Sequence, residues 1–494
     1  MTTRATSGAP GPAGTLGGQV AIYGVAHLAV AALNFMLFPI YARALQPADY
    51  GAMSLLATVC SAVSMLGLMG MNNSVQRFFF DERDPAMQQR IWSTGFLASL
   101  ALTVAAVLVA GLLLWALKDY QPALSGWPAA LALAAMVPQI VVIWLQDQAR
   151  LQFRPLRFAT VAVAQAVLGG VAGILFVAVW HWALPGFFAA GLLAAIATAL
   201  AAMFTARSFW PLTFSRRELR RLIRFGAPFV PAGVFIWLSS AVLRWMLAGS
   251  KGLAEAGMFD VAWKLAAPIW MLNIAVGQAF GPYAFRLRAE DPDYRTKLVD
   301  ALHAIGVVTL FAACGVMLFA RELCVWIASA AYELAAGPCG ILALGFCFSA
   351  THQVTALGIA FTEKSHWVAV GWGGAALASA GLAFWFVPAL GASGAAWCVV
   401  LAYAGLTFFY AMCTQRLHPL PFRLGPLAVQ LALGVLTVAF ALTMQRQALS
   451  VTAAGIKLLW WVAAAAVLMV WGGVEPRQLV AMLARLPGIA PRRA

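Results

Sequence analysis

The sequence contains little charge for its length. Only 10% of its 494 residues are Asp, Glu, Lys or Arg, while 63% are hydrophobic. A soluble globular protein of this length could not remain dispersed in water with that balance. A soluble class is therefore excluded, and a lipid bilayer must supply most of the solvent around the chain.

Motifs for metals, nucleotides and covalent catalysis are also missing. The seven cysteines include no C-x-x-C pair, and the chain has no H-E-x-x-H, G-x-S-x-G or G-x-x-x-x-G-K-[ST] segment. The six histidines are scattered singly. We therefore predict no catalytic residue, no metal site and no cofactor. Coupling to H⁺ or Na⁺ is left open by the sequence.

Long apolar windows recur along the whole chain. A helix needs roughly 20 apolar residues to cross about 30 Å of hydrocarbon, because its backbone groups must all be bonded internally. The sequence therefore predicts an all-α polytopic membrane protein of about fourteen transmembrane helices. They are expected at 18–41, 50–71, 91–117, 127–148, 158–180, 184–206, 226–248, 257–281, 300–320, 335–358, 366–388, 390–413, 425–445 and 451–471.

Basic residues fall mainly on one side when the chain is followed through these helices. Twenty-four Lys and Arg lie on the side of the N-terminus, five lie on the opposite side and three lie within spans. Because cytoplasmic loops carry an excess of Lys and Arg, both termini are predicted to be cytoplasmic. The net charge of +15 then reflects topology and anionic lipid headgroups, and we expect no nucleic-acid partner.

The densest basic run extends from Ser215 to Arg224. Its apolar residues Leu219, Leu222 and Ile223 share one helical stripe surrounded by arginines, as in an amphipathic helix at a membrane interface. We interpret the run as a topology signal in preference to a specific regulatory or partner site.

The two halves of the chain share a pattern at an offset of a little over 200 residues. The matched pairs are Tyr23-Gly24 with Phe225-Gly226, Arg43 with Arg244, Gly51 with Gly257, and Asp84-Pro85 with Asp291-Pro292. This pattern predicts two six-helix lobes in a parallel pseudo-repeat plus two C-terminal helices. The expected divisions are a disordered cytoplasmic tail (1–17), an N-terminal lobe (18–206), a basic linker (207–225), a C-terminal lobe (226–413), two additional helices (414–471) and a cytoplasmic tail (472–494).

A few ionisable residues fall inside the apolar windows, where each costs roughly 3 kcal/mol at the centre of a span. Arg244 lies in the window 226–248, and Asp260 and Lys264 follow in the next window. The latter two are four residues apart with the acid first, so they can pair on one helix face. One interpretation is a cationic cavity for a phosphate-bearing substrate, joined by Arg43. The other is a self-satisfied ion pair, with arginines that extend to the headgroups.

Polar residues on the first helix form a further candidate set. His27 and Asn34 are seven residues apart and share a face. Such donors suit sugar recognition, although hydrogen bonds between helices explain them equally well. On the cytoplasmic side, Arg77 and Arg224 are candidates for a gate or a headgroup contact.

Three segments near the N-terminus carry a family resemblance. They are Pro39-Ile40-Tyr41-Ala42-Arg43, the turn Leu45-x-Pro47-x-Asp49-Tyr50-Gly51, and Gly67-Leu68 through Arg77-Phe78. They resemble the polysaccharide transporter (oligosaccharide flippase) family of the multidrug/oligosaccharidyl-lipid/polysaccharide (MOP) exporter superfamily. In the second half, Gly257 to Leu265 is similar to the family's G-x-Y-x-x-A-x-K-L segment, with Phe259 in place of Tyr and Asp260 as an added charge.

This resemblance implies a flippase that moves a polyprenyl-pyrophosphate-linked oligosaccharide across the bacterial inner membrane by alternating access. The substrate would be an O-antigen or exopolysaccharide repeat unit, and other membrane proteins of polysaccharide assembly would be partners. The resemblance also implies a V-shaped pair of lobes and a cationic cavity that includes Arg43 and Lys264. Helices thirteen and fourteen would hold the polyprenyl tail, as in lipid II flippases.

The resemblance leaves the substrate open. No basic residue occurs from Gly17 to Ala42, which disfavours lipid II itself. A cation-coupled multidrug exporter of the same superfamily is the main alternative. A membrane polysaccharide polymerase or ligase is a third candidate, but such enzymes generally need a larger outer loop than this sequence offers.

Overall fold

The computed structural model describes residues 16–119, 121–205, 212–227, 229–364, 366–445 and 450–473. Within these ranges the chain forms helices joined by turns, without a β-strand. The predicted tails up to residue 15 and from residue 474, and residues 207–211 of the predicted linker, lie outside the described residues.

The chain separates into two compact units. The first comprises the described residues up to Leu45 together with Leu55–Trp237, and the second comprises Gln46–Ser54 and the described residues from Leu238 onwards. The start of α2 (Pro47–Leu68) therefore belongs to the second unit, and the start of α9 (Phe229–Ser250) belongs to the first. The expected division into lobes, linker and additional helices stays a prediction.

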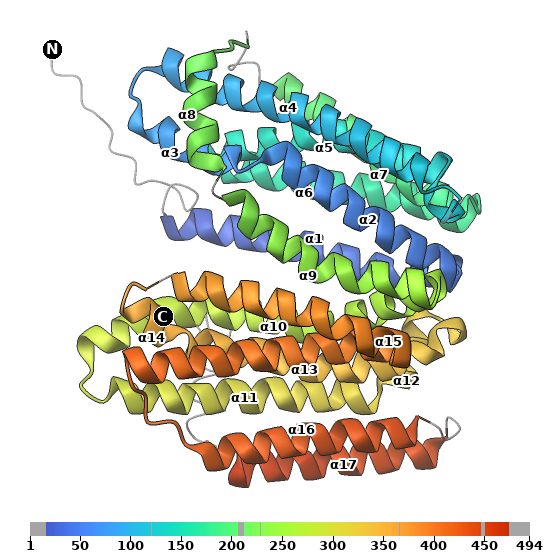
Figure 1. Cartoon of the computed structure of the whole chain (residues 1–494), viewed down its shortest axis with the longest axis vertical. Helices are drawn as coiled ribbons and strands as arrows, with labels where there is room; N and C mark the ends of the chain where they lie inside the picture. The colour runs from blue at the N-terminus through green and yellow to red at the C-terminus, as the bar shows by residue number, and fades with distance from the viewer. Residues whose placement is uncertain are drawn as a thin grey trace, which may run out of the picture. The chain divides into compact units, whose positions relative to one another are not determined.

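The first unit is a bundle of long helices with shorter helices beside them (Figure 1). Besides parts of α2 and α9 it contains α1 (Leu16–Ala44), α3 (Met71–Asp81), α4 (Pro85–Ala116), η2 (Pro122–Leu124), α5 (Trp127–Leu151), α6 (Pro155–Gly173), η3 (Ile174–Val179), α7 (Ala183–Thr205) and α8 (Arg216–Gly226). Aromatic side chains join α4 to α5: Trp92 stacks on Phe96 within α4 and meets Trp144 of α5 edge-on. Such close packing holds these helices together.

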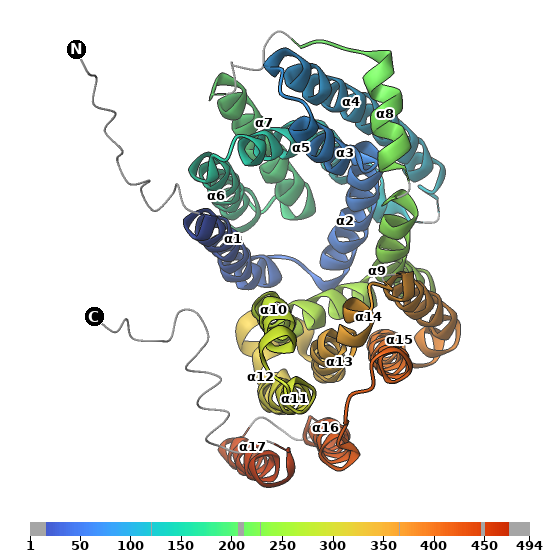
Figure 2. The same cartoon turned by 90° about the vertical axis from the view of Figure 1, so that its left-hand side faces the viewer.

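The basic segment predicted at the membrane interface forms α8, and its apolar stripe packs on protein. Leu222 is buried in the same core as Trp92, with Leu219 and Ile223 packed against that core. Figures 1 and 2 show α8 beside α3 and α4, which it contacts. The apolar stripe therefore packs on neighbouring helices, and the location of α8 at the membrane interface stays a prediction.

The second unit contains the remaining helices. They are α10 (Leu253–Glu290), α11 (Tyr294–Leu318), α12 (Ala320–Leu323), η5 (Cys324–Ala328), η6 (Ala330–Ala335), α13 (Ala336–Thr355), α14 (Leu357–Phe361), α15 (His366–Leu417), α16 (Leu424–Met444) and α17 (Val451–Trp471). The helices α10, α11 and α13 pack against one another, and α15 packs on α13 (Figure 2).

The last two helices pack on α11. Leu310 of α11 shares an apolar cluster with Leu433 of α16 and Leu468 of α17. At the other end of the contact, the buried Nζ of Lys457 lies 2.5 Å from a carboxylate oxygen of the buried Glu322. Because an unpaired buried charge is costly, this ion pair favours one register of α17 against α12.

Twelve helices among the described residues are long and apolar enough to cross a membrane. The chain is therefore a multi-pass membrane protein, but the predicted count of fourteen is not confirmed. Two predicted spans, 366–388 and 390–413, lie within the 52-residue α15, which is counted once although its backbone turns sharply at Gly391. The predicted span 257–281 lies within α10, which is not among the twelve.

The turn inside α15 is capped by a carboxylate from α10. Gly391 adopts a positive φ of 58°, and the next backbone N–H, that of Ala392, donates to Oε2 of Glu255 at 2.7 Å. This bond satisfies a donor at the start of the second half of α15, as a helix N-cap does.

We expect Glu255→Ala to lower the free energy of unfolding by about 1 to 2 kcal/mol, because it leaves that N–H without its acceptor. The thermal midpoint of the detergent-purified protein measures the effect. Glu290→Ala, which removes an exposed i,i+4 pair with Arg286 at the far end of the same helix, is the control and should change stability by less than about 0.5 kcal/mol. Equal midpoints for the two variants would contradict the capping role.

Candidate functional site

Two glycines allow the start of α2 to lie directly against α10. A Cβ added at Gly51 would lie 1.9 Å from the carbonyl oxygen of Leu253, and one added at Gly257 would lie 2.0 Å from that of Pro47. These neighbours are backbone atoms, so only glycine fits at either position. Small residues permit this kind of backbone approach between membrane helices. The approach brings Tyr50, which precedes Gly51, close to α10.

Arg244 of α9 is enclosed by protein and bonded to Asp260 of α10. Its Nη2 and Nε donate to Oδ1 of Asp260 at 2.9 and 3.2 Å, and Nε also donates to the Ser54 hydroxyl at 3.0 Å. The side chains of Arg244 and Asp260 are only 11% and 10% exposed. Its guanidinium also lies 5.6 Å from the ring centre of Trp263. Asp260 is thus the carboxylate that pairs with this arginine.

Lys264 is the accessible cation of the cluster. Its Nζ lies 3.6 Å from Oδ2 of Asp260 and donates to the Tyr50 hydroxyl at 2.6 Å. Its side chain is 39% exposed, far more than that of Arg244. The Tyr50 ring is buried and meets Tyr332 edge-on, with 5.9 Å between ring centres. Two cations share one carboxylate, so the cluster carries a net charge of about +1 in its ordinary ionisation state.

The structure brings Arg244, Asp260 and Lys264 together, but Asp260 has a closer cationic partner than the i,i+4 spacing indicated. Lys264 lies within ion-pair distance of Asp260, as i,i+4 spacing allows, but Arg244 makes the shorter contact. Sequence reasoning missed Tyr50 and Ser54 as members of the cluster. Tyr50 belongs to the family-like turn, and Ser54 precedes Asp260 by the offset that matches Gly51 to Gly257.

The other predicted cavity residues, His27, Asn34 and Arg43, all lie on α1 in the first unit. The three side chains are exposed on that unit. His27 bonds through Nδ1 to the carbonyl oxygen of Tyr23 at 2.8 Å and stacks on Phe158. Their grouping with the Lys264 cluster stays a prediction, since that cluster lies wholly in the second unit.

The predicted cytoplasmic residues Arg77 and Arg224 both lie in the first unit, on α3 and α8. Both are exposed. Arg77 lies over the ring of Phe225, 5.3 Å from its centre, and Arg224 lines a cavity of about 490 Å³ next to that ring. Arg77 and Arg224 therefore both lie near the Phe225 side chain.

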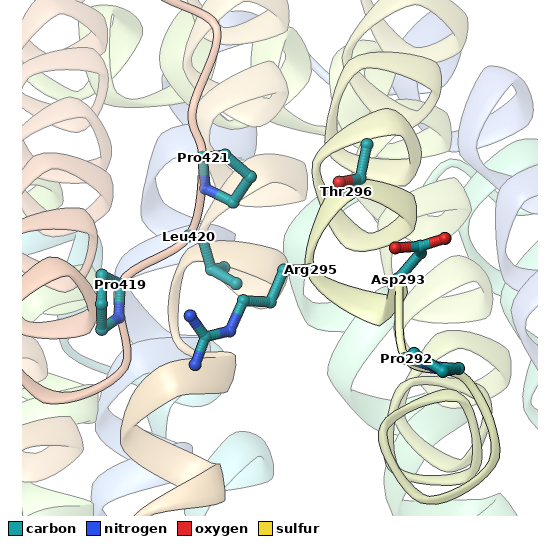
Figure 3. A pocket seen from close by; sticks show the side chains of 7 residues that line it. All are labelled: Pro292, Asp293, Arg295, Thr296, Pro419, Leu420 and Pro421. Carbon is teal, nitrogen blue, oxygen red and sulfur yellow. The ribbon is translucent and has the colours of Figure 1, made fainter.

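The second unit has a cavity of about 420 Å³ at the turn between α10 and α11 (Figure 3). It is lined by Pro292, Asp293, Arg295, Thr296, Pro419, Leu420 and Pro421. Beside it, Tyr294 forms a hydrogen bond with His418 at 2.9 Å.

The ionisable groups near this cavity have shifted pKa values. Burial lowers the pKa of His418, and the nearby Arg295 lowers it further. A hydrogen bond from Lys297 lowers the pKa of Asp291. Both charge signs line this cavity, so it favours no ion.

A family model described as polysaccharide biosynthesis protein matches residues 40–336, more than half of the chain. The chain belongs to this family. The polysaccharide biosynthesis match includes the whole Lys264 cluster, because Tyr50, Arg244 and Asp260 also lie within its limits. No curated protein matches the sequence.

Solved structures show the fold of this polysaccharide biosynthesis protein. It is similar to lipid II flippase MurJ in an inward closed conformation, with a TM-score of 0.68 and 10% identity over 94% of this chain and 99% of that one. It is also similar to a multidrug resistance MATE family transporter of the MOP superfamily in an inward-facing conformation, with a TM-score of 0.57 and 17% identity over 81% and 97%. A MATE structure in complex with MaD3S gives a TM-score of 0.52 at 16% identity over 82% and 96%. The chain thus shares the fold of these solved structures.

Proposed function

We propose that the chain moves a polyprenyl-pyrophosphate-linked oligosaccharide from the cytoplasmic to the outer leaflet of the bacterial inner membrane. The observation that carries this proposal is the partly exposed Lys264 on α10, held by Tyr50 beside the Arg244–Asp260 pair. The polysaccharide biosynthesis family and a fold similar to a lipid II flippase support it. Transport by this fold requires no covalent chemistry.

The charge of the cluster suits a diphosphate. Lys264 presents three donors on a flexible stem, and the buried Arg244 adds a second positive charge behind it. A diphosphate brings more negative charge than the one carboxylate of Asp260, so it can compete for Lys264 without displacing the tighter Arg244 contact. The glycan would then cross as the two lobes alternate access.

A multidrug exporter is the second candidate, because two of the similar structures are MATE proteins. The charge of the Lys264 cluster argues against it. Organic cations would be repelled by a site whose accessible group is an ammonium. The match to a polysaccharide biosynthesis family also favours the glycan substrate. We therefore propose a role in polysaccharide assembly, and we propose further that both termini are cytoplasmic and that membrane proteins of polysaccharide assembly are partners.

Deleting the gene should cause the lipid-linked repeat unit to accumulate on the cytoplasmic leaflet, because its pyrophosphate headgroup does not cross hydrocarbon unaided. Accessibility of the glycan to a lectin, in right-side-out against inverted membrane vesicles, measures its leaflet. Restoring the wild-type gene is the control and should return the glycan to the outer leaflet. If the unit reached the outer leaflet in the deletion strain but stayed unpolymerised, a polymerase role would replace the flippase.

A further inference from the structure

The first unit contains a basic cavity between α3 and α8, which we call the α3–α8 pocket. Its lining residues are Phe78, Arg220, Arg221, Arg224 and Phe225. No acidic side chain is among them. The cavity of about 490 Å³ falls within the usual range for small-molecule sites.

The walls of the α3–α8 pocket are fixed by packing. The Ser74 hydroxyl of α3 donates to the carbonyl oxygen of Leu222 of α8 at 2.9 Å. The backbone of Gly226 lies so close to Gly70 that a Cβ on Gly70 would be 2.5 Å from its carbonyl oxygen. The rings of Phe78 and Phe225 meet edge to face. These contacts fix the positions of the two helices that line the pocket.

One arginine of the pocket is already neutralised. The guanidinium of Arg221 lies 4.0 Å from the ring centre of Phe78 and pairs with Glu82 at 3.3 Å and Glu218 at 3.6 Å. These two carboxylates are therefore engaged. Neither Arg220 nor Arg224 forms an ion pair with another described residue, and both are exposed.

The cavity of the second unit provides an internal comparison. It lies in a corresponding place, between the end of a long helix (α10) and a segment that follows a later one (Pro419 to Pro421). There an acid, Asp293, and a base, Arg295, both line the cavity (Figure 3). Position in the fold alone therefore does not explain the unbalanced positive charge of the α3–α8 pocket.

We propose that the α3–α8 pocket binds a phosphate ester of a membrane lipid through Arg220 and Arg224. Guanidinium groups match phosphate oxygens in a two-pronged geometry, and the walls of Phe78 and Phe225 keep water away from one side of the contact. The ligand is either a phosphoglycerol headgroup or a polyprenyl diphosphate. Both present the same oxyanion chemistry to the pocket.

The test compares two double variants that remove the same charge from the same helix. Arg220→Gln with Arg224→Gln removes the pocket arginines, whereas Arg216→Gln with Arg217→Gln removes two exposed arginines outside it. Both are made in a Lys264→Ala background, so that the proposed transport site does not contribute. Binding of farnesyl diphosphate, and of phosphatidylglycerol added to detergent-purified protein, is followed by native mass spectrometry.

We expect the pocket variant to weaken binding of at least one of the two lipids about tenfold or more, and the control variant to change it less than about twofold. The lipid that shows the difference identifies the source of the phosphate. Equal losses in both variants would mean diffuse attraction and would overturn the proposal, as would no loss in either. Because the Lys264→Ala background already lacks the cation of the proposed transport site, and the assay measures binding at the α3–α8 pocket alone, failure here would leave the proposed flippase function untouched.

Discussion

Lys264→Ala is expected to reduce surface glycan export about 10- to 100-fold while leaving the amount of membrane-inserted protein unchanged. Contacts to charged groups contribute about 1.5 to 3 kcal/mol, which corresponds to that range. The substitution removes the accessible cation and leaves Arg244 and Asp260 as a neutral pair. Export is measured as polymerised glycan on the cell surface, at matched protein levels.

Two variants make this experiment specific. Lys264→Arg keeps the positive charge next to Tyr50 and should retain most of the export. Lys251→Ala removes an exposed lysine beyond the end of α9, so it changes the net charge equally without touching the cluster. If Lys264→Ala exported at the wild-type level, or if Lys251→Ala lost as much, the assignment of Lys264 to the substrate would fail.

Arg244→Ala is a poorer test of the same idea. Arg244 is the closest cationic partner of a carboxylate that is only 10% exposed. Removing Arg244 takes away the shortest ion pair of this carboxylate and leaves it with the longer Lys264 contact, so the variant should lose up to the roughly 3 to 5 kcal/mol that breaking a buried pair costs. Any loss of export in that variant would report on folding as well as on substrate binding, whereas Lys264 can be removed with the pair intact.

The long helices could be predicted because a helix that crosses lipid needs roughly 20 apolar residues, and hydropathy identifies such segments. The expected span 451–471 coincides with α17, and 425–445 differs from α16 by one residue at each end. Hydropathy fails where a helix continues beyond the hydrocarbon, as α10 does from 253 to 290, or where no polar loop marks a turn, as at Gly391 in α15. It also cannot say whether the apolar stripe of α8 meets lipid or protein.

The charged members of the site were visible in the sequence for a simple reason. An ionisable residue inside an apolar window is costly, so Arg244, Asp260 and Lys264 could be singled out from their positions alone. The i,i+4 spacing indicated the Asp260–Lys264 pair, but the shorter contact between Arg244 and Asp260 could not be predicted, because it depends on which face α9 turns toward α10. Tyr50 was missed as a partner of Lys264, since a tyrosine near the start of a span costs little and gives no such signal.

The second large expected effect is a loss of stability when the close contact between α2 and α10 is disturbed. We expect Gly257→Ala to lower the free energy of unfolding by about 3 kcal/mol or more, at the upper end of the range for overpacked interiors. The new Cβ would lie 2.0 Å from the carbonyl oxygen of Pro47 and 2.9 Å from the backbone nitrogen of Gly51. Backbone atoms cannot rotate aside, so the helices must separate.

Gly281→Ala is the matched control for this prediction. It makes the same change on the same helix, at a position where an added Cβ meets nothing within 4 Å. Alanine there should be neutral or should raise stability by up to about 1 kcal/mol, because glycine is the poorer helix former. The thermal midpoint of the purified protein distinguishes the two, and separation of the helices in Gly257→Ala should also draw Tyr50 from Lys264 and reduce export. Equal midpoints for Gly257→Ala and the wild type would show that α2 and α10 do not approach as described.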